Sequence, residues 1–106
     1  MKRYKGTHDN RVIVQEVDDD NRVVSERYLS GGRFVWGSQY TRGTLCLAKS
    51  MLIDAVGFEH GFAEFAYEVL ANLSPLDGWT IYASNIEAWV AGKRDAAEFR
   101  QWAMGG

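Results

Sequence analysis

The residues best suited to bind a ligand or a partner lie between positions 33 and 44. Arginine and aromatic side chains are interleaved there and are followed by a threonine. The candidate set is Arg33, Trp36, Tyr40, Arg42 and Thr44. Residues 37–44 join an expected strand to an expected helix, so backbone amides at the helix N-terminus would attract an anion. The two aromatic rings are not constrained by any apolar periodicity, and we expect them to face outward as a stacking surface. The competing interpretation is a plain connection in which a threonine caps the helix.

Patterns for catalysis or metal binding have less support. The two histidines, His8 and His60, lie far apart, and no zinc, dithiol or serine-hydrolase motif occurs. Asp54, Glu59 and His60 combine carboxylates with an imidazole, which is the chemistry of an acid–base site. Ordinary surface positions explain all three residues equally well. The acidic run at 18–21 lacks the glycine and distal glutamate of a calcium loop, so we expect a solvated turn. We therefore expect no catalytic residue, no metal and no cofactor.

Charge and cysteine content narrow the class of protein. The formal net charge of -2 argues against a duplex nucleic-acid binder, which needs a basic excess. The single cysteine, Cys46, cannot form an internal disulfide, and its place in an apolar helical run predicts a buried, unreactive thiol. No apolar stretch approaches the roughly 18 residues that span a bilayer. We expect a soluble, cytoplasmic protein without membrane contact.

Strand patterns occupy the first third of the chain. Residues 11–17 and 22–28 are rich in β-branched side chains, and the break between them predicts a β-hairpin. A short strand around Tyr4 and another at 33–36 would extend the hairpin to an antiparallel meander of three to four strands.

Helical periodicity dominates the rest of the chain. Apolar residues recur at helical spacing over 45–56 and 62–73. Ser84 and Glu87 have the spacing of a capping box for a short helix that would end at Gly92. An extended segment at 79–82 precedes that short helix. A last amphipathic helix is expected at 95–104, with Phe99 and Trp102 on one face.

These elements predict an α+β fold in a single domain, residues 1–106. The part from 1 to 37 would be mainly β and the part from 44 to 106 mainly α. The N-terminal meander would pack against three to four C-terminal helices, because a sheet with one apolar face needs a cover.

Some of these residues also occur in the order of a known family. They are Tyr4-Lys5-Gly6, then Phe34-Val35-Trp36-Gly37, then a polar glycine-containing loop and an Ala/Leu-rich helix with Asp54. In this order the chain resembles a domain-of-unknown-function family of small bacterial and archaeal proteins, over about Tyr4 to Val90. It departs from the family at 38–44, where the loop usually has more glycine and a Pro-Ala-Gln-like helix entry. The resemblance implies a single domain and brings no activity.

The function favoured by these observations is a non-enzymatic module that binds another protein, including a second copy of itself. Four tryptophans and five tyrosines are many for 106 residues, and such residues are enriched at binding hot spots. One concrete version is a phage- or plasmid-encoded accessory protein that inhibits a host defence complex of the CRISPR type. The alternatives are single-stranded nucleic acid or a small anionic ligand bound by the Trp36–Thr44 loop, and then a small enzyme of unknown reaction.

If the loop is the site, the combined substitution Tyr40→Ala and Arg42→Ala is expected to abolish capture of a protein partner, while Asp54→Ala leaves it intact. Nucleic-acid binding would instead weaken steeply as salt is raised from 50 to about 200 mM. Affinity capture from lysate and titration of a labelled oligonucleotide measure the two cases. Equal capture by the wild type and the double variant would contradict the loop assignment.

Overall fold

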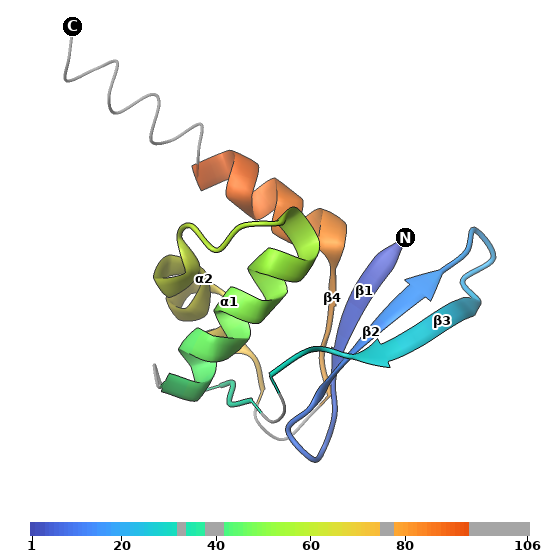
Figure 1. The fold of residues 1–106 in the computed structure, drawn as a ribbon, viewed down its shortest axis with the longest axis horizontal. Coiled ribbons are helices and arrows are strands. Elements are labelled where there is room, and N and C mark those ends of the chain that lie inside the picture. Colours follow the sequence, from blue (N-terminus) through green and yellow to red (C-terminus); the bar gives the residue numbers. More distant parts are fainter. Residues whose placement is uncertain (32–33, 38–41, 75–77, 94–106) are drawn as a thin grey trace, which may run out of the picture.

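A four-stranded antiparallel sheet forms one side of the computed structural model, and helices cover one of its faces (Figure 1). The model describes residues 1–31, 34–37, 42–74 and 78–93. The strands are β1 (Lys2–Gly6), β2 (Val12–Val17), β3 (Val23–Tyr28) and β4 (Thr80–Tyr82). Their order in the sheet is β3-β2-β1-β4, so β1 lies between β2 and a strand from the second half of the chain. The predicted α+β class is therefore confirmed.

Short polar turns connect the first three strands. In the turn after β1, Asn10 adopts a φ of 63°, and in the turn after β2, Asn21 adopts a φ of 65°. Asparagine tolerates this left-handed conformation better than most residues. The carboxylate of Asp18 accepts the backbone N–H of Asp20 at 3.0 Å and of Arg22 at 2.9 Å. The acidic run is thus an exposed turn, as the sequence predicted.

The helices follow the predicted periodicity with three corrections. They are α1 (Arg42–Val56), α2 (Phe62–Glu68), the short 3-10 helix η1 (Leu70–Asn72) and a helix over residues 83–93. The predicted helix at 62–73 is broken at Val69. The capping box is wrong, because residue 83 is already helical and it is Asn85 whose side chain accepts the N–H of Tyr82, at 3.0 Å. The helix also continues past Gly92, and the predicted helix at 95–104 lies outside the described residues.

The predicted strand at 33–36 is also wrong in its described part, which has no regular structure. Phe34 and Trp36 are 2% and 7% exposed, and Val35 between them is exposed, so the burial alternates as in a strand. The backbone, however, pairs with a turn: the Phe34 N–H donates to the Asn10 carbonyl at 2.7 Å. The Asn10 side chain donates back to the Phe34 carbonyl at 3.1 Å. The buried side chains of this segment therefore fill part of the core, and its backbone does not join the sheet.

The core lies between the sheet and the helices. Its fully buried side chains come from both layers, and the largest are Tyr4, Phe34, Phe65, Leu47, Met51, Leu52, Leu70 and Ile86. β3 contributes none, since all six of its residues are exposed. Helical cover therefore reaches the inner strands and leaves β3 at an open edge.

Gly6 is required by a close approach between β1 and a tryptophan. A side chain at this position would overlap the indole ring of Trp79, whose carbonyl accepts the Gly6 N–H at 3.1 Å. The Trp79 indole N–H is buried and has no hydrogen-bond partner among the described residues. Its edge contacts Trp36 at a centroid distance of 5.4 Å. The glycine of the Tyr-Lys-Gly segment is therefore a packing requirement.

Gly6→Ala is expected to lower the free energy of unfolding by about 1–3 kcal/mol, because the added methyl group must displace a buried ring. Urea denaturation followed by tryptophan fluorescence measures the change. The matched control is Gly92→Ala, where a methyl group meets open space on a helix. That control should leave stability unchanged or raise it by up to about 1 kcal/mol. Equal stability of Gly6→Ala and wild type would contradict the packing argument.

Candidate functional site

The predicted loop site is not assembled by the residues that the structure describes. Arg33 and Tyr40 lie outside the described residues. Trp36 is 7% exposed, so the expectation that it faces outward is wrong: its ring is held edge-to-face against Trp79. Thr44 is fully buried on the face of α1 that packs on the core. Arg42, exposed at the start of α1, is the described member of the set that a ligand could reach.

Asp54, near the end of α1, is the hub of a polar cluster that joins the helix to the sheet. Its carboxylate accepts hydrogen bonds from the Tyr4 hydroxyl at 2.7 Å, from Lys2 Nζ at 3.1 Å and from the Arg27 guanidinium. Lys2 Nζ also donates to the Asp54 carbonyl at 2.9 Å. The donors come from β1 and β3. One carboxylate therefore ties α1 to an inner strand and to the open edge strand.

The protonation of this cluster follows from its contacts. Burial would raise the pKa of Asp54, but hydrogen bonds from Tyr4, Arg27 and Lys2 outweigh it and lower the pKa below the ordinary 3.8. Burial, together with the hydrogen bond to Asp54, raises the pKa of the Tyr4 hydroxyl. Asp54 thus stays ionised and its oxygens are occupied by donors. Glu59 and His60 are exposed, and no hydrogen bond joins either of them to Asp54 among the described residues. These residues therefore do not form the acid–base site considered from the sequence.

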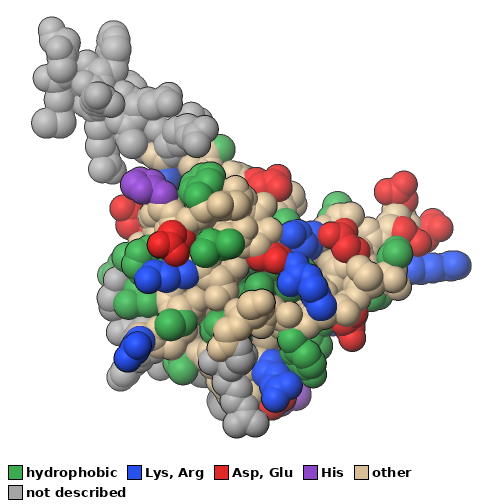
Figure 2. Space-filling view, in the orientation of Figure 1, with side chains coloured by type: hydrophobic (Ala, Val, Ile, Leu, Met, Phe, Trp, Pro, Cys, Tyr) green, Lys and Arg blue, Asp and Glu red, His purple; other side chains and the backbone are tan. Residues whose placement is uncertain are grey.

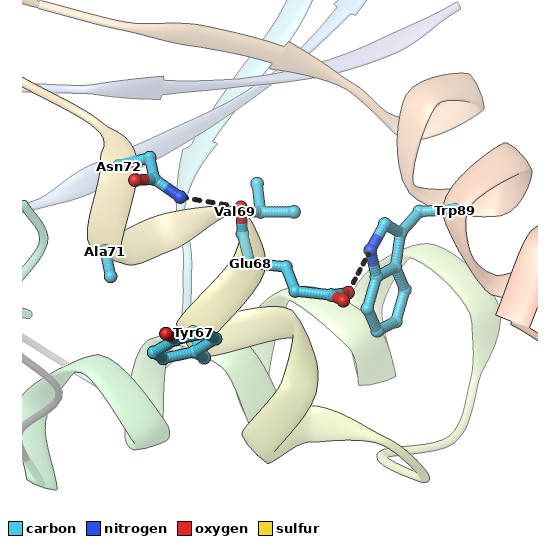
Figure 3. A pocket seen from close by; sticks show the side chains of 6 residues that line it. All are labelled: Tyr67, Glu68, Val69, Ala71, Asn72 and Trp89. Carbon is cyan, nitrogen blue, oxygen red and sulfur yellow. Dashed lines mark hydrogen bonds between the residues drawn. The ribbon is translucent and has the colours of Figure 1, made fainter.

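An open hollow lies between the end of α2 and the helix over residues 83–93 (Figure 3). It has a volume of about 710 Å³ and is lined by Tyr67, Glu68, Val69, Ala71, Asn72 and Trp89. A second hollow of about 490 Å³, lined by Ala63, Glu64, Tyr67 and Glu68, adjoins it. Tyr67, which is 70% exposed, and Glu68 belong to both. We call these two hollows and their lining residues the α2 surface.

Glu68 organises the polar part of the α2 surface. One carboxylate oxygen accepts the Trp89 indole N–H at 3.1 Å, and the other accepts Lys93 Nζ at 2.6 Å. The hydrogen bond from Lys93 holds the pKa of Glu68 below its usual 4.5. The Trp89 ring also packs edge-to-face against Phe65, at a centroid distance of 5.2 Å. The surface therefore combines a positioned carboxylate with two aromatic rings.

Sequence reasoning missed this surface because it followed the apolar face of the helix. The stripe that runs through Phe62, Phe65, Ala66 and Val69 predicts which side packs on the core, and Phe65 and Ala66 are indeed buried. Tyr67 lies off that stripe. A large aromatic residue on the otherwise polar side of an amphipathic helix is the signal that could have found the site.

The face shown in Figure 2 is mixed in charge. Positive and negative side chains are interspersed over the helices, and acidic side chains lie beside a basic one at the far end of the β2–β3 hairpin. Cys46 is exposed, so the prediction of a buried thiol is wrong. It lies on the solvent side of α1, next to the buried Leu47 and Ala48.

Within the described ranges, no three histidine, cysteine, aspartate or glutamate side chains converge to hold a metal ion. None of the described helices has the length and apolar character needed to cross a membrane. Comparison of the chain with protein-family models, curated proteins and solved structures gives no match.

Asp54→Asn is expected to lower the free energy of unfolding by about 1–2 kcal/mol at pH 7, because it weakens hydrogen bonds to a charged acceptor. The folded-state pKa of Asp54 is lowered, so its stabilising contribution is complete above the unfolded value near 4 and disappears as pH falls through the folded value. Urea denaturation at pH 7, 5 and 3 should show the wild type and variant converging in acid. Glu59→Gln, which removes an exposed carboxylate, is the control and should differ little from wild type at any pH. A stability difference between Asp54→Asn and wild type that persists unchanged at pH 3 would contradict the assignment.

Proposed function

We propose that this protein is a non-enzymatic interaction module that binds another protein through the α2 surface. The observation that carries the proposal is the exposure of Tyr67 between two adjoining hollows. At 70% exposed, its ring contributes little to the core, yet partner side chains could pack on either side of it. Tyrosine and tryptophan placed beside pockets are the residues that dominate protein interfaces.

The fate of the other aromatic residues supports this choice. Trp36 and Trp79 are used in the core, and Trp89 is partly buried against Phe65. Tyr28 is 57% exposed, but it stands on the edge strand β3, where the Arg11 guanidinium lies 5.0 Å from its ring centre. Tyr67 thus combines greater exposure with a concave setting.

In the biological version that we propose, the protein is a phage- or plasmid-encoded accessory factor that inhibits a host defence complex of the CRISPR type. Glu64 and Glu68 lie beside Tyr67, and the chain carries a net charge of -2. Such a surface suits a basic patch that otherwise holds nucleic acid, because complementary charge steers association. Absence of binding to any such complex at micromolar concentration would remove this version and leave the module itself standing.

The alternatives are supported by fewer described residues. Binding of single-stranded nucleic acid or a small anion would use Arg33 and four side chains of the Trp36–Thr44 loop. Trp36 and Thr44 are buried, which leaves Arg42 as the accessible one within the described residues. An enzyme would need convergent titratable groups in a pocket. Asp54, the best placed candidate, is already occupied by three donors.

Tyr67→Ser is expected to abolish capture of the partner, or to weaken its binding at least about tenfold, because the central aromatic anchor is lost. Tyr28→Ser is the matched control: it removes another tyrosine that is more than half exposed, from the opposite layer, and should leave binding within about twofold. Tagged proteins are passed through lysate of host cells, and the retained protein is then titrated against each variant by calorimetry.

Retention of full binding by Tyr67→Ser would contradict the proposal. If the loop double variant Tyr40→Ala, Arg42→Ala lost binding in that case, the interface would move to residues 36–44. Urea denaturation of each variant accompanies the titrations, so that loss of binding is separated from loss of folding.

A further inference from the structure

The α2 surface already holds a cation that belongs to the protein itself. Lys93 Nζ lies 2.6 Å from one oxygen of Glu68 and 3.8 Å from an oxygen of Glu64. The same nitrogen lies 5.6 Å from the centre of the Trp89 ring. Two carboxylates and one aromatic face thus meet at a single ammonium group.

Lys93 is a weakly held occupant. Its side chain is 39% exposed, as is that of Glu68, and that of Glu64 is 65% exposed. Ion pairs at this degree of exposure contribute little to stability, because water competes for both partners and a long side chain must be ordered. A stronger cationic ligand can therefore displace Lys93 at small cost to the fold.

The geometry around Glu68 suits a guanidinium better than an ammonium. Its carboxylate is held in place by the Trp89 indole N–H at 3.1 Å and points toward the Trp89 ring, whereas Tyr67 lines the same hollow on the other side (Figure 3). A planar guanidinium can donate two parallel hydrogen bonds to a carboxylate while its plane stacks on an aromatic ring, whereas the ammonium of lysine meets both groups only as a point charge. The volume of about 710 Å³ leaves room for the arginine stem.

We infer that the α2 surface receives an arginine side chain from a basic segment of the protein partner, which replaces Lys93 on the carboxylate of Glu68 beside the Trp89 ring. This inference rests on the proposed function and names the chemistry of its partner. Lys93 acts as a competitor that occupies the site in the free protein. Removing it should tighten binding, whereas a lysine with a purely supporting role would weaken binding when removed.

The test uses the intact chain and the peptide acetyl-Gly-Arg-Gly-amide, with lysine and citrulline peptides of the same length. Binding is followed by NMR through the indole N–H resonance of Trp89, identified with a Trp89→Phe variant. We expect the arginine peptide to shift this resonance with a millimolar dissociation constant, and the uncharged citrulline peptide to have no effect. Glu68→Gln should weaken binding at least about fivefold, and Lys93→Ala should tighten it about threefold.

Asp19→Asn is the matched control, because it removes one exposed acidic charge at the distant β2–β3 turn. It should leave the affinity within about 1.5-fold at 150 mM salt, where the Debye length is about 8 Å. Equal weakening by Asp19→Asn and Glu68→Gln, no shift at 20 mM peptide, or weaker binding to Lys93→Ala would each overturn the inference.

The two proposals fail separately. If the arginine peptide does not bind but Tyr67→Ser still abolishes binding of the captured partner, the interaction module stands and its partner chemistry is different. If the peptide binds but Tyr67→Ser leaves partner binding intact, the arginine site exists and the proposed interface is wrong.

Discussion

The carboxylate of Asp54 is the contact on which the arrangement of helix and sheet depends. It accepts hydrogen bonds from two residues of β1 and one of β3, and it belongs to α1. Apolar packing fixes how deeply the helix sits on the sheet, but it tolerates sliding and rotation. A charged acceptor that three donors approach from two strands allows neither sliding nor rotation of the helix. Removing the Asp54 carboxylate would leave the buried Tyr4 hydroxyl unpaired. The cluster therefore sets the register of the two layers.

Much of the architecture could be predicted from local pattern. The β2–β3 hairpin and α1 were found because their apolar residues recur with the period of their own backbone, and that signal needs no knowledge of the partner element. The segment at 34–36 shows the limit of this reasoning. Its burial alternates as in a strand, yet no strand lies beside it, and its backbone pairs with Asn10. Whether an alternating segment joins a sheet depends on distant residues that periodicity does not report.

The candidate binding surface was harder to predict than the fold for a related reason. Aromatic residues near glycine and arginine favour the loop around Trp36 as a site, but the Trp36 indole is buried and packs edge-to-face with Trp79, whose ring lies over Gly6. A tryptophan's large apolar area favours burial whenever a neighbouring gap fits it, and only the three-dimensional structure shows the gap. Tyr67 gave the opposite signal, since a ring outside the apolar stripe has no core to enter. Asp54 looked like an ordinary surface residue because its partners lie on strands far away in the sequence.

The strand order has a consequence for how the chain reaches this structure during translation. β1 and β2 emerge from the ribosome early, but the second neighbour of β1, β4, follows only after both α1 and α2 have been made. At about 5–20 residues per second, an inner edge of the sheet stays unpaired for several seconds. Over that interval the nascent chain exposes a row of free amides and carbonyls on β1. A chaperone or a neighbouring nascent strand would bind first at this edge.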